Sequence, residues 1–160
     1  MAKSIPDGQQ TITPHLVVNG ASEAIEFYKR AFAAEELGRL PMPGPDGRVK
    51  VGHAELRIGS SRLYLADEFP EHGSSGPNGR SPVTIHMYVT DADATFRRAV
   101  EAGATVSMPL ADMFWGDRFG KVVDPFGHHW SIAAHLEDLT PEQMKQRMAA
   151  AFGGPPCGPE

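Results

Sequence analysis

An internal repeat is the feature of this sequence that most constrains its fold. The segment that begins at His15 matches the segment that begins at His86 at a shift of 71 residues. Each copy starts with a β-prone stretch, crosses a short polar turn and enters a helical pattern. Further positions match in kind, namely Val18 with Val89, Ala21 with Ala92, Ile25 with Phe96 and Ala31 with Ala102. We therefore expect two copies of one supersecondary unit in tandem.

A helical periodicity follows each polar turn. Ser22 in the first copy and Asp91 or Asp93 in the second are residue types that favour the N-cap position. Gly103 is expected to end the second helix, because glycine adopts the left-handed conformation of a C-cap without strain. The apolar residues of the first helix fall on one face: Ala24, Ile25, Tyr28 and Phe32.

Strand-like segments follow each helix, at 36–40, 49–58 and 62–66 in the first copy and at 104–108, 119–123 and 130–134 in the second. The pattern predicts an α+β fold of two tandem βαβββ modules. One helix covers only one face of its sheet, so the other face must meet something else. Two modules side by side are expected to form a curved, mixed eight-stranded sheet with a concave pocket and the helices on the outside.

The same pattern predicts the domain organisation. A last helix carries one apolar stripe, formed by Met144, Met148 and Phe152. This stripe is expected to contact either the core or a second subunit. Thr140, Pro141 and Gln143 are typical of the start of such a helix. The segments are a flexible N-terminus 1–10, a first module 11–70, a linker 71–81, a second module 82–137, a C-terminal helix 138–152 and a disordered tail 153–160.

Composition excludes several classes of protein. Apolar residues make up 41% and charged residues 22% of the chain, which is typical of a globular domain. The net charge of −5 opposes attraction to nucleic acid. No apolar segment is long enough to span a membrane, and the first residues contain no signal-peptide pattern. The single cysteine, Cys157, favours no internal disulfide. We expect a soluble, cytoplasmic protein without nucleic-acid or membrane partners.

Two motifs resemble a known family. Glu26-Phe27-Tyr28 on the first helix resembles the "FY" helix of the vicinal oxygen chelate superfamily, the glyoxalase and bleomycin-resistance relatives. The segment 124–131, DPFGHHWS, resembles the "DPxG" turn of that superfamily. The segments 53–59, 114–118 and 133–135 look like its PhnB-like branch, whose members are typically homodimers. The resemblance covers about residues 11 to 152 and implies a glyoxalase-like fold.

The resemblance implies one of two kinds of chemistry. Many members use a divalent metal to polarise vicinal oxygens of a substrate, whereas bleomycin-binding members have neither metal nor reaction. The positions that hold metal ligands in the metal-dependent members correspond here to Thr13, Thr84 and Ser131. A neutral hydroxyl is a poor ligand for a divalent transition metal. We therefore expect the usual metal site to be lost.

His15 and His86 keep a metal alternative open. Each lies two residues after its threonine and so points to the same side of its strand. Together with an acid such as Glu55, the two imidazoles would form a displaced site for Zn, Ni, Fe or Mn. The other interpretation is a pair of histidines that hydrogen-bond in a polar pocket or bind a ligand without metal.

Further ligand-binding candidates lie on two segments. His53 and Glu55 share one face of a strand and are expected either to face the pocket or to pair structurally, for example with Arg57 or Arg118. Trp115 and Arg118 belong to a segment suited to stack on a flat ligand and bind its polar end. The alternative is a loop held by an Asp117–Arg118 pair, with Trp115 closing the core.

Two functional classes follow from these patterns. The first is a glyoxalase-like homodimer that binds a small organic molecule in the concave sheet without the usual metal site. The second is a divalent-metal-dependent lyase, isomerase or dioxygenase that uses His15, His86 and Glu55. The sequence has no nucleophile elbow, phosphate-binding glycine loop or Cys–His pair. It leaves open whether the pocket forms within one chain or across two.

Overall fold

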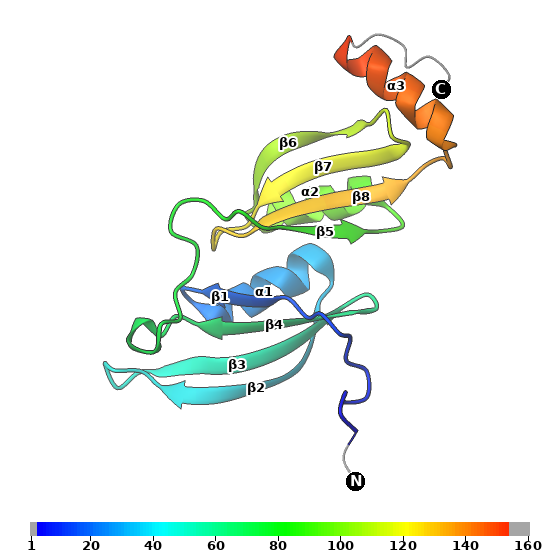
Figure 1. Ribbon diagram of the computed structural model, residues 1–160. Coiled ribbons are helices and arrows are strands. Elements are labelled where there is room, and N and C mark those ends of the chain that lie inside the picture. Colours follow the sequence, from blue (N-terminus) through cyan, green and yellow to red (C-terminus); the bar gives the residue numbers. More distant parts are fainter. Residues whose placement is uncertain (1–2, 154–160) are drawn as a thin grey trace.

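The structure is a computed structural model, and it describes residues 3–153 (Figure 1). Cys157 and all of the predicted tail except Gly153 lie outside the described residues. The first module comprises β1 (His15–Val18), α1 (Ala21–Phe32), β2 (Glu35–Pro43), β3 (Val49–Ile58) and β4 (Ser61–Asp67). The second comprises β5 (Thr84–Tyr88), α2 (Ala92–Ala102), β6 (Thr105–Asp112), β7 (Asp117–Val123) and β8 (His129–His135). A 3-10 turn, η1 (Pro70–His72), lies between them, and α3 (Pro141–Phe152) follows.

The two sheets have the same topology. Their strand orders are β1-β4-β3-β2 and β5-β8-β7-β6, with the first pair parallel and the other pairs antiparallel in each sheet. This confirms the α+β class and the tandem βαβββ modules. The eight strands do not join into one sheet within the chain, because each module completes its own four-stranded sheet and β1 and β5 remain edge strands.

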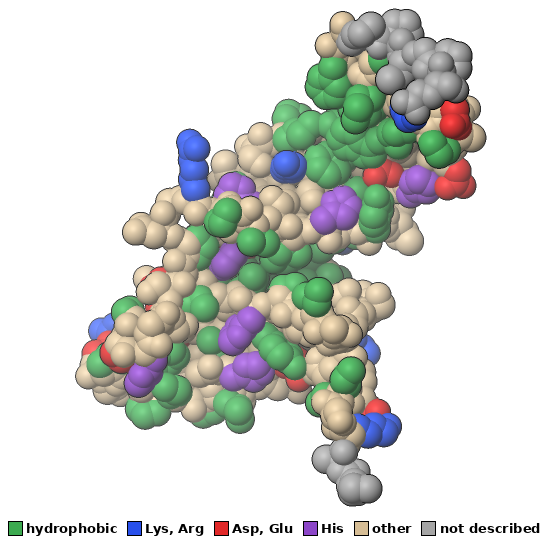
Figure 2. All heavy atoms as spheres, in the orientation of Figure 1, with side chains coloured by type: hydrophobic (Ala, Val, Ile, Leu, Met, Phe, Trp, Pro, Cys, Tyr) green, Lys and Arg blue, Asp and Glu red, His purple; other side chains and the backbone are tan. Residues whose placement is uncertain are grey.

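One helix covers one face of each sheet. Leu56 and Leu65 are fully buried on the side of α1, whereas His53 and Tyr64 on the opposite side are only half-buried. Strand alternation produces this division, since successive side chains point to opposite faces. We call the face without a helix the open face. Figure 2 shows histidine side chains over both sheets on one side of the molecule.

The helices α1 and α2 pack against each other, so they lie between the modules rather than on the outside as predicted. Small side chains allow this close approach, because Ala24, Ala31 and Ala99 are completely buried. Aromatic rings extend the contact: the ring centroids of Phe32 and Trp130 are 4.6 Å apart. The two modules therefore share one hydrophobic core.

The helix ends agree only in part with the predicted caps. Asp91 caps α2 by accepting a hydrogen bond from the Ala94 amide, and Thr140 with Gln143 forms a capping box on α3. The helix α1 starts differently from the prediction. Its N-cap is Gly20 instead of Ser22, and the distant Asp67 carboxylate accepts from the Gly20 and Ala21 amides at 3.1 and 2.8 Å. Local sequence does not reveal this tertiary cap.

The strand β2 is longer than the predicted segment 36–40 and runs through Pro41 and Pro43. Proline is tolerated there because β2 is an edge strand and its amides need no second partner. Among residues 3–153, no helix is both long and apolar enough to cross a membrane.

Candidate functional site

The motifs that carry the family resemblance form a structural node between the modules. The Tyr28 hydroxyl donates to Asp124 Oδ2 at 2.6 Å, and the Trp130 indole donates to the same oxygen at 2.9 Å. The other carboxylate oxygen accepts from the amides of Phe126 and His128. Burial and the neighbouring Asp124 raise the pKa of Tyr28 well above its ordinary value. This node holds α1 to the β7–β8 turn and does not reach an open face.

The open face of the first sheet carries a row of three side chains across three strands. His15 is paired in register with Tyr64, and Tyr64 with Glu55. The His53 ring lies 5.9 Å from the His15 ring and 4.8 Å from the Tyr64 ring. Partial burial and then the charge of His53 lower the pKa of His15. Three of the predicted residues, His15, His53 and Glu55, are therefore neighbours.

Glu55 is engaged by other groups of the first module. Arg62 forms an ion pair with its carboxylate at 2.7 Å, and the Gln9 side-chain amide donates to it at 2.7 Å. The predicted alternatives of Arg57 and Arg118 as partners of Glu55 are wrong, because Arg57 pairs with Glu35 and Arg118 with Asp93. Glu55 is therefore a neutralised acid.

The N-terminal segment lies over part of this open face. Gly8 accepts a hydrogen bond from Arg62 through its carbonyl oxygen, and Gln9 reaches Glu55. A cavity of about 330 Å³ lies under the segment and is lined by Ser4, Ile5, Pro6, Gln9, Gln10, Thr11, Thr13 and Tyr64. Within residues 3–153, the Oε1 atom of Gln9 is buried without a hydrogen-bond partner. The predicted residue Thr13 thus lines a cavity beside the first open face.

The open face of the second sheet carries the corresponding row. His86 is paired in register with Ser131, and Ser131 with Lys121. The Ser131 hydroxyl is buried and lies 2.7 Å from Nδ1 of His86. The predicted residue Thr84 precedes His86 on the same face and is exposed. Because the strand orders are identical, His86, Ser131 and Lys121 occupy the positions that His15, Tyr64 and Glu55 occupy in the first sheet.

Aromatic rings surround the second row. The ring centroids of Phe119 and His86 are 6.0 Å apart with an interplanar angle of 23°, and those of Trp115 and Phe119 are 5.3 Å apart in an edge-to-face arrangement. The ring centroids of Tyr88 and His86 are 4.7 Å apart, and Tyr88 is 62% exposed. Trp115 thus belongs to an open face rather than to the core. Sequence reasoning missed Phe119 and Tyr88, although Phe119 adjoins the buried Gly120 and Tyr88 adjoins the partly buried Met87 on its strand.

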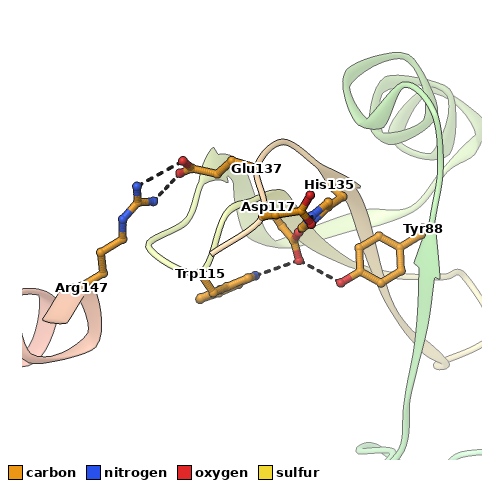
Figure 3. A network of polar contacts seen from close by, with 7 residues as sticks. Tyr88, Trp115, Asp117, His135, Glu137 and Arg147 are labelled. Atoms are coloured by element: carbon orange, nitrogen blue, oxygen red, sulfur yellow. Dashed lines mark hydrogen bonds and ion pairs between the residues drawn. The ribbon is translucent and has the colours of Figure 1, made fainter. Parts of the chain in front are cut away.

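A buried carboxylate organises the end of this face, as Figure 3 shows. Asp117 accepts hydrogen bonds from the Tyr88 hydroxyl at 3.0 Å, the Trp115 indole at 3.1 Å and Nδ1 of His135 at 2.8 Å. The other ring nitrogen of His135 lies 3.0 Å from Asp138. The hydrogen bonds to Asp117 and Asp138 raise the pKa of His135. Burial acts to raise the pKa of Asp117, but its hydrogen bonds outweigh burial and lower that pKa.

Arg118 does not reach the open face. Its guanidinium donates to both carboxylate oxygens of Asp93 on α2, at 2.6 and 2.8 Å, and to Asp112 at 2.8 Å. Strand alternation explains the difference, because Arg118 lies between Asp117 and Phe119 and must point to the helix side. The predicted pairing of Arg118 with Asp117 is also absent, since Asp117 is held by Tyr88, Trp115 and His135.

The predicted metal ligands are not gathered within one chain. His15 and His86 belong to different sheets, and Glu55 is bound by Arg62. Throughout the described part of the chain, no group of three His, Cys, Asp or Glu side chains is placed to hold a metal ion. The residues at the customary family positions, Thr13, Thr84 and Ser131, offer only hydroxyls, and that of Ser131 is already bonded to His86. These residues do not fit a transition-metal site.

The fold and the two open faces define a tandem βαβββ protein, and comparison with known proteins identifies its family. The model of the Glyoxalase/Bleomycin resistance protein/Dioxygenase superfamily matches residues 10–132. The chain belongs to this superfamily. An uncharacterized protein of Mycobacterium tuberculosis is similar, with 46% identity over 151 residues that cover 91% of this chain and 86% of the relative.

Solved structures show the same architecture. The structure of PA1353 from Pseudomonas aeruginosa matches with a TM-score of 0.65 and 29% identity, over 81% of this chain and 100% of that one. TioX from Micromonospora sp. ML1 matches with a TM-score of 0.63 and 28% identity, over 79% and 99%. A PhnB protein from Bacillus cereus matches over 78% and 99% with a TM-score of 0.63, and its 21% identity shows likeness of fold alone.

Proposed function

We propose that the protein binds a small organic molecule on its open faces, without a metal at the positions customary in the superfamily. The observation that carries the proposal is the second open face, where aromatic rings and polar groups lie side by side on the side of the sheet opposite α2. His86 is exposed and Tyr88 is 62% exposed, although neither is needed by the hydrophobic core. Clustered aromatic side chains with a few oriented polar groups are typical of ligand sites.

A homodimer would complete the site, and we propose this assembly as well. Within one chain β1 and β5 end their sheets as open edges, so a concave eight-stranded sheet requires a module from a second copy. Exposed apolar residues support an unfilled interface: Leu40, Val49, Val83 and Tyr88 are each more than half exposed. We further propose that the protein belongs to the PhnB-like branch, because its segments 53–59 and 114–118 resemble that branch.

The binding proposal is tested by thermal unfolding in the presence of a library of small organic acids, amines and aromatic compounds. A ligand that binds only the folded state raises Tm, and the rise grows with the ratio of ligand concentration to Kd. Two variants locate the site: His86→Ala lies on the second open face, and His72→Ala in η1 is a matched exposed control. A Tm rise that survives in His72→Ala and is lost in His86→Ala supports the proposal. Equal effects of the two substitutions would contradict it.

The metal alternative is separated by elemental analysis of protein purified without chelators or an affinity tag. Metal-free protein that still binds ligands supports the proposed function. Stoichiometric Zn, Ni, Fe or Mn that is lost in the His15→Ala, His86→Ala double variant would contradict it, and would indicate a metal shared between the two open faces. Light scattering decides the assembly, since a dimer has twice the mass of the 17.3 kDa chain.

A further inference from the structure

Lys121 is the cation on the second open face. It lies at the middle of the sheet, on β7, and is half-buried. Its ammonium forms no ion pair with any carboxylate of residues 3–153, whereas Arg62 and Arg118 are both paired. The nearest acid on its own strand face, Asp117, is already held by three donors. The Lys121 ammonium is therefore available to an anionic ligand.

The two neighbours of Lys121 in its row are also hydrogen-bonding groups. Ser131 and His86 follow it across adjacent strands, which are about 4.8 Å apart, so the three side chains span roughly 10 Å. The Ser131 hydroxyl holds Nδ1 of His86 at 2.7 Å and thereby orients the ring. Lysine offers three donors, and the bonded Ser131–His86 pair keeps one more, which is Nε2 of the ring or the serine hydroxyl depending on the tautomer. Such a row is suited to the two or three oxygens of an anionic group.

A flat apolar platform adjoins the row. The Lys121 ammonium lies 5.9 Å from the centroid of Phe119, and the Phe119 ring is nearly parallel to that of His86. Trp115 adds an edge-on contact to Phe119. A ligand with its anionic group on Lys121 would place an adjoining ring beside Phe119 and Trp115, where aromatic pairs are favourable.

The first row differs in charge at the position of Lys121. Glu55 occupies that position and is neutralised by Arg62 and Gln9. An anionic group would meet no free cation there. The two rows therefore favour one orientation of a ligand, with its anionic end toward the second module.

We propose that the row His86, Ser131 and Lys121 is an anion-binding subsite that receives the carboxylate or phosphate group of a planar ligand. This inference rests on the proposed function, and it adds the class and the orientation of the ligand. Lys121 supplies the charge, and the bonded His86–Ser131 pair supplies one oriented donor. The anionic group in turn neutralises the Lys121 ammonium.

Three probes that share one ring system test the subsite by isothermal titration calorimetry: 1-naphthoate, 1-naphthyl phosphate and 1-naphthamide. The amide matches the carboxylate in shape and lacks its charge. We expect one or both anions to bind about tenfold more tightly than the amide, and Lys121→Gln to abolish this preference while leaving amide binding unchanged. Whichever anion loses more affinity identifies the carboxylate or the phosphate as the preferred group.

Two further variants serve as controls. Lys121→Arg keeps the charge and should keep the preference for anions. Lys145→Gln on α3 removes the same charge from an exposed position of the chain and should change nothing. Equal affinity for 1-naphthoate, 1-naphthyl phosphate and 1-naphthamide, or an equal loss in Lys121→Gln and Lys145→Gln, would overturn the subsite while leaving the proposed small-molecule function intact. No binding of any probe would overturn the subsite, and the Tm screen would then judge the proposed function separately.

Discussion

The two modules have the same strand order and pairing but different side chains at equivalent positions of their open faces. In the first module the row His15, Tyr64 and Glu55 contains an acid that is neutralised internally, and the N-terminal segment lies over it. In the second module the row His86, Ser131 and Lys121 contains a free cation and is bordered by exposed rings. The two open faces therefore share one backbone arrangement but differ in chemistry. The free cation on the second face makes that face the better suited of the two to an anionic ligand.

The modules also differ in how they use a buried carboxylate. Asp67 acts within the first module, where it accepts from the amides of Gly20, Ala21 and Val51. Asp124 of the second module reaches across to Tyr28 of the first. The first carboxylate therefore stabilises a helix start, and the second holds the modules together.

The largest effect is expected from removing the link between the modules. Asp124→Ala leaves Tyr28, Trp130 and two amides without an acceptor, and should lower the free energy of unfolding by about 3 kcal/mol in a urea titration. Tyr28→Phe removes one of these bonds and should cost about 1.5 kcal/mol. In the Asp124→Ala background the same Tyr28→Phe change should cost much less. Full additivity would show that Tyr28 is stabilised by packing alone.

Reversing the charge at Lys121 tests the difference between the two rows. Lys121→Glu introduces an acid at the position that Glu55 occupies in the first row. Calorimetry should show binding of 1-naphthoate weakened on the order of 100-fold, because attraction becomes repulsion. Glu55→Gln on the first row should change this affinity by less than about twofold. Comparable losses in both variants would place the anionic group between the two rows rather than on the second.

The pH dependence of stability should differ in sign between the modules. The pKa of His135 is raised by Asp117 and Asp138, so its stabilising contribution is complete below the ordinary value of 6.5 and is lost as the pH rises through the folded-state pKa. The pKa of His15 is lowered by burial and His53, so the folded state binds this proton less well and stability falls as the pH drops below 6.5.

Tm measured from pH 5 to pH 9 tests this difference. His135→Asn should lower Tm most at the acidic end, whereas His15→Asn should remove part of the acid destabilisation and raise Tm there relative to the unmodified protein. Tyr88, which also contacts Asp117, titrates outside this range because its pKa is raised. Parallel Tm curves for all three proteins would contradict both assignments.

The smallest effects are expected at the paired arginines. Arg62→Gln breaks a partly exposed ion pair with Glu55 and should cost less than about 1 kcal/mol of stability. Arg118→Gln breaks the pairs with Asp93 and Asp112 on the helix side of the second sheet, and should lower Tm slightly. Affinity for 1-naphthoate should remain unchanged in Arg118→Gln. A loss of affinity comparable to that of Lys121→Gln would show that Arg118 contributes to ligand binding.

The sequence by itself determined the modules, because repeats and alternation are local properties. The shift between His15 and His86 predicted two βαβββ units, and Asp91 and Thr140 marked helix starts that the structure has. It also identified His53 and Glu55 as residues that share one strand face, and the structure adds His15 of β1 beside His53. The prediction places Arg118 at the ligand site because the predicted strand starts at residue 119, whereas Asp117 and Arg118 begin β7 and point to opposite faces.

Only the tertiary structure decided which groups meet. The pairing of Tyr28 with Asp124 and of Asp67 with the start of α1 joins residues that are 96 and 46 positions apart, and no local pattern encodes such contacts. The structure also shows that the strands form two sheets. The strands of each module hydrogen-bond only to one another, and the Ala-rich faces of α1 and α2 pack together. It revealed Lys121 as a free cation, since pairing depends on the positions of all nearby carboxylates. The internal repeat therefore predicts the two modules, and the contacts formed on folding make their open faces different.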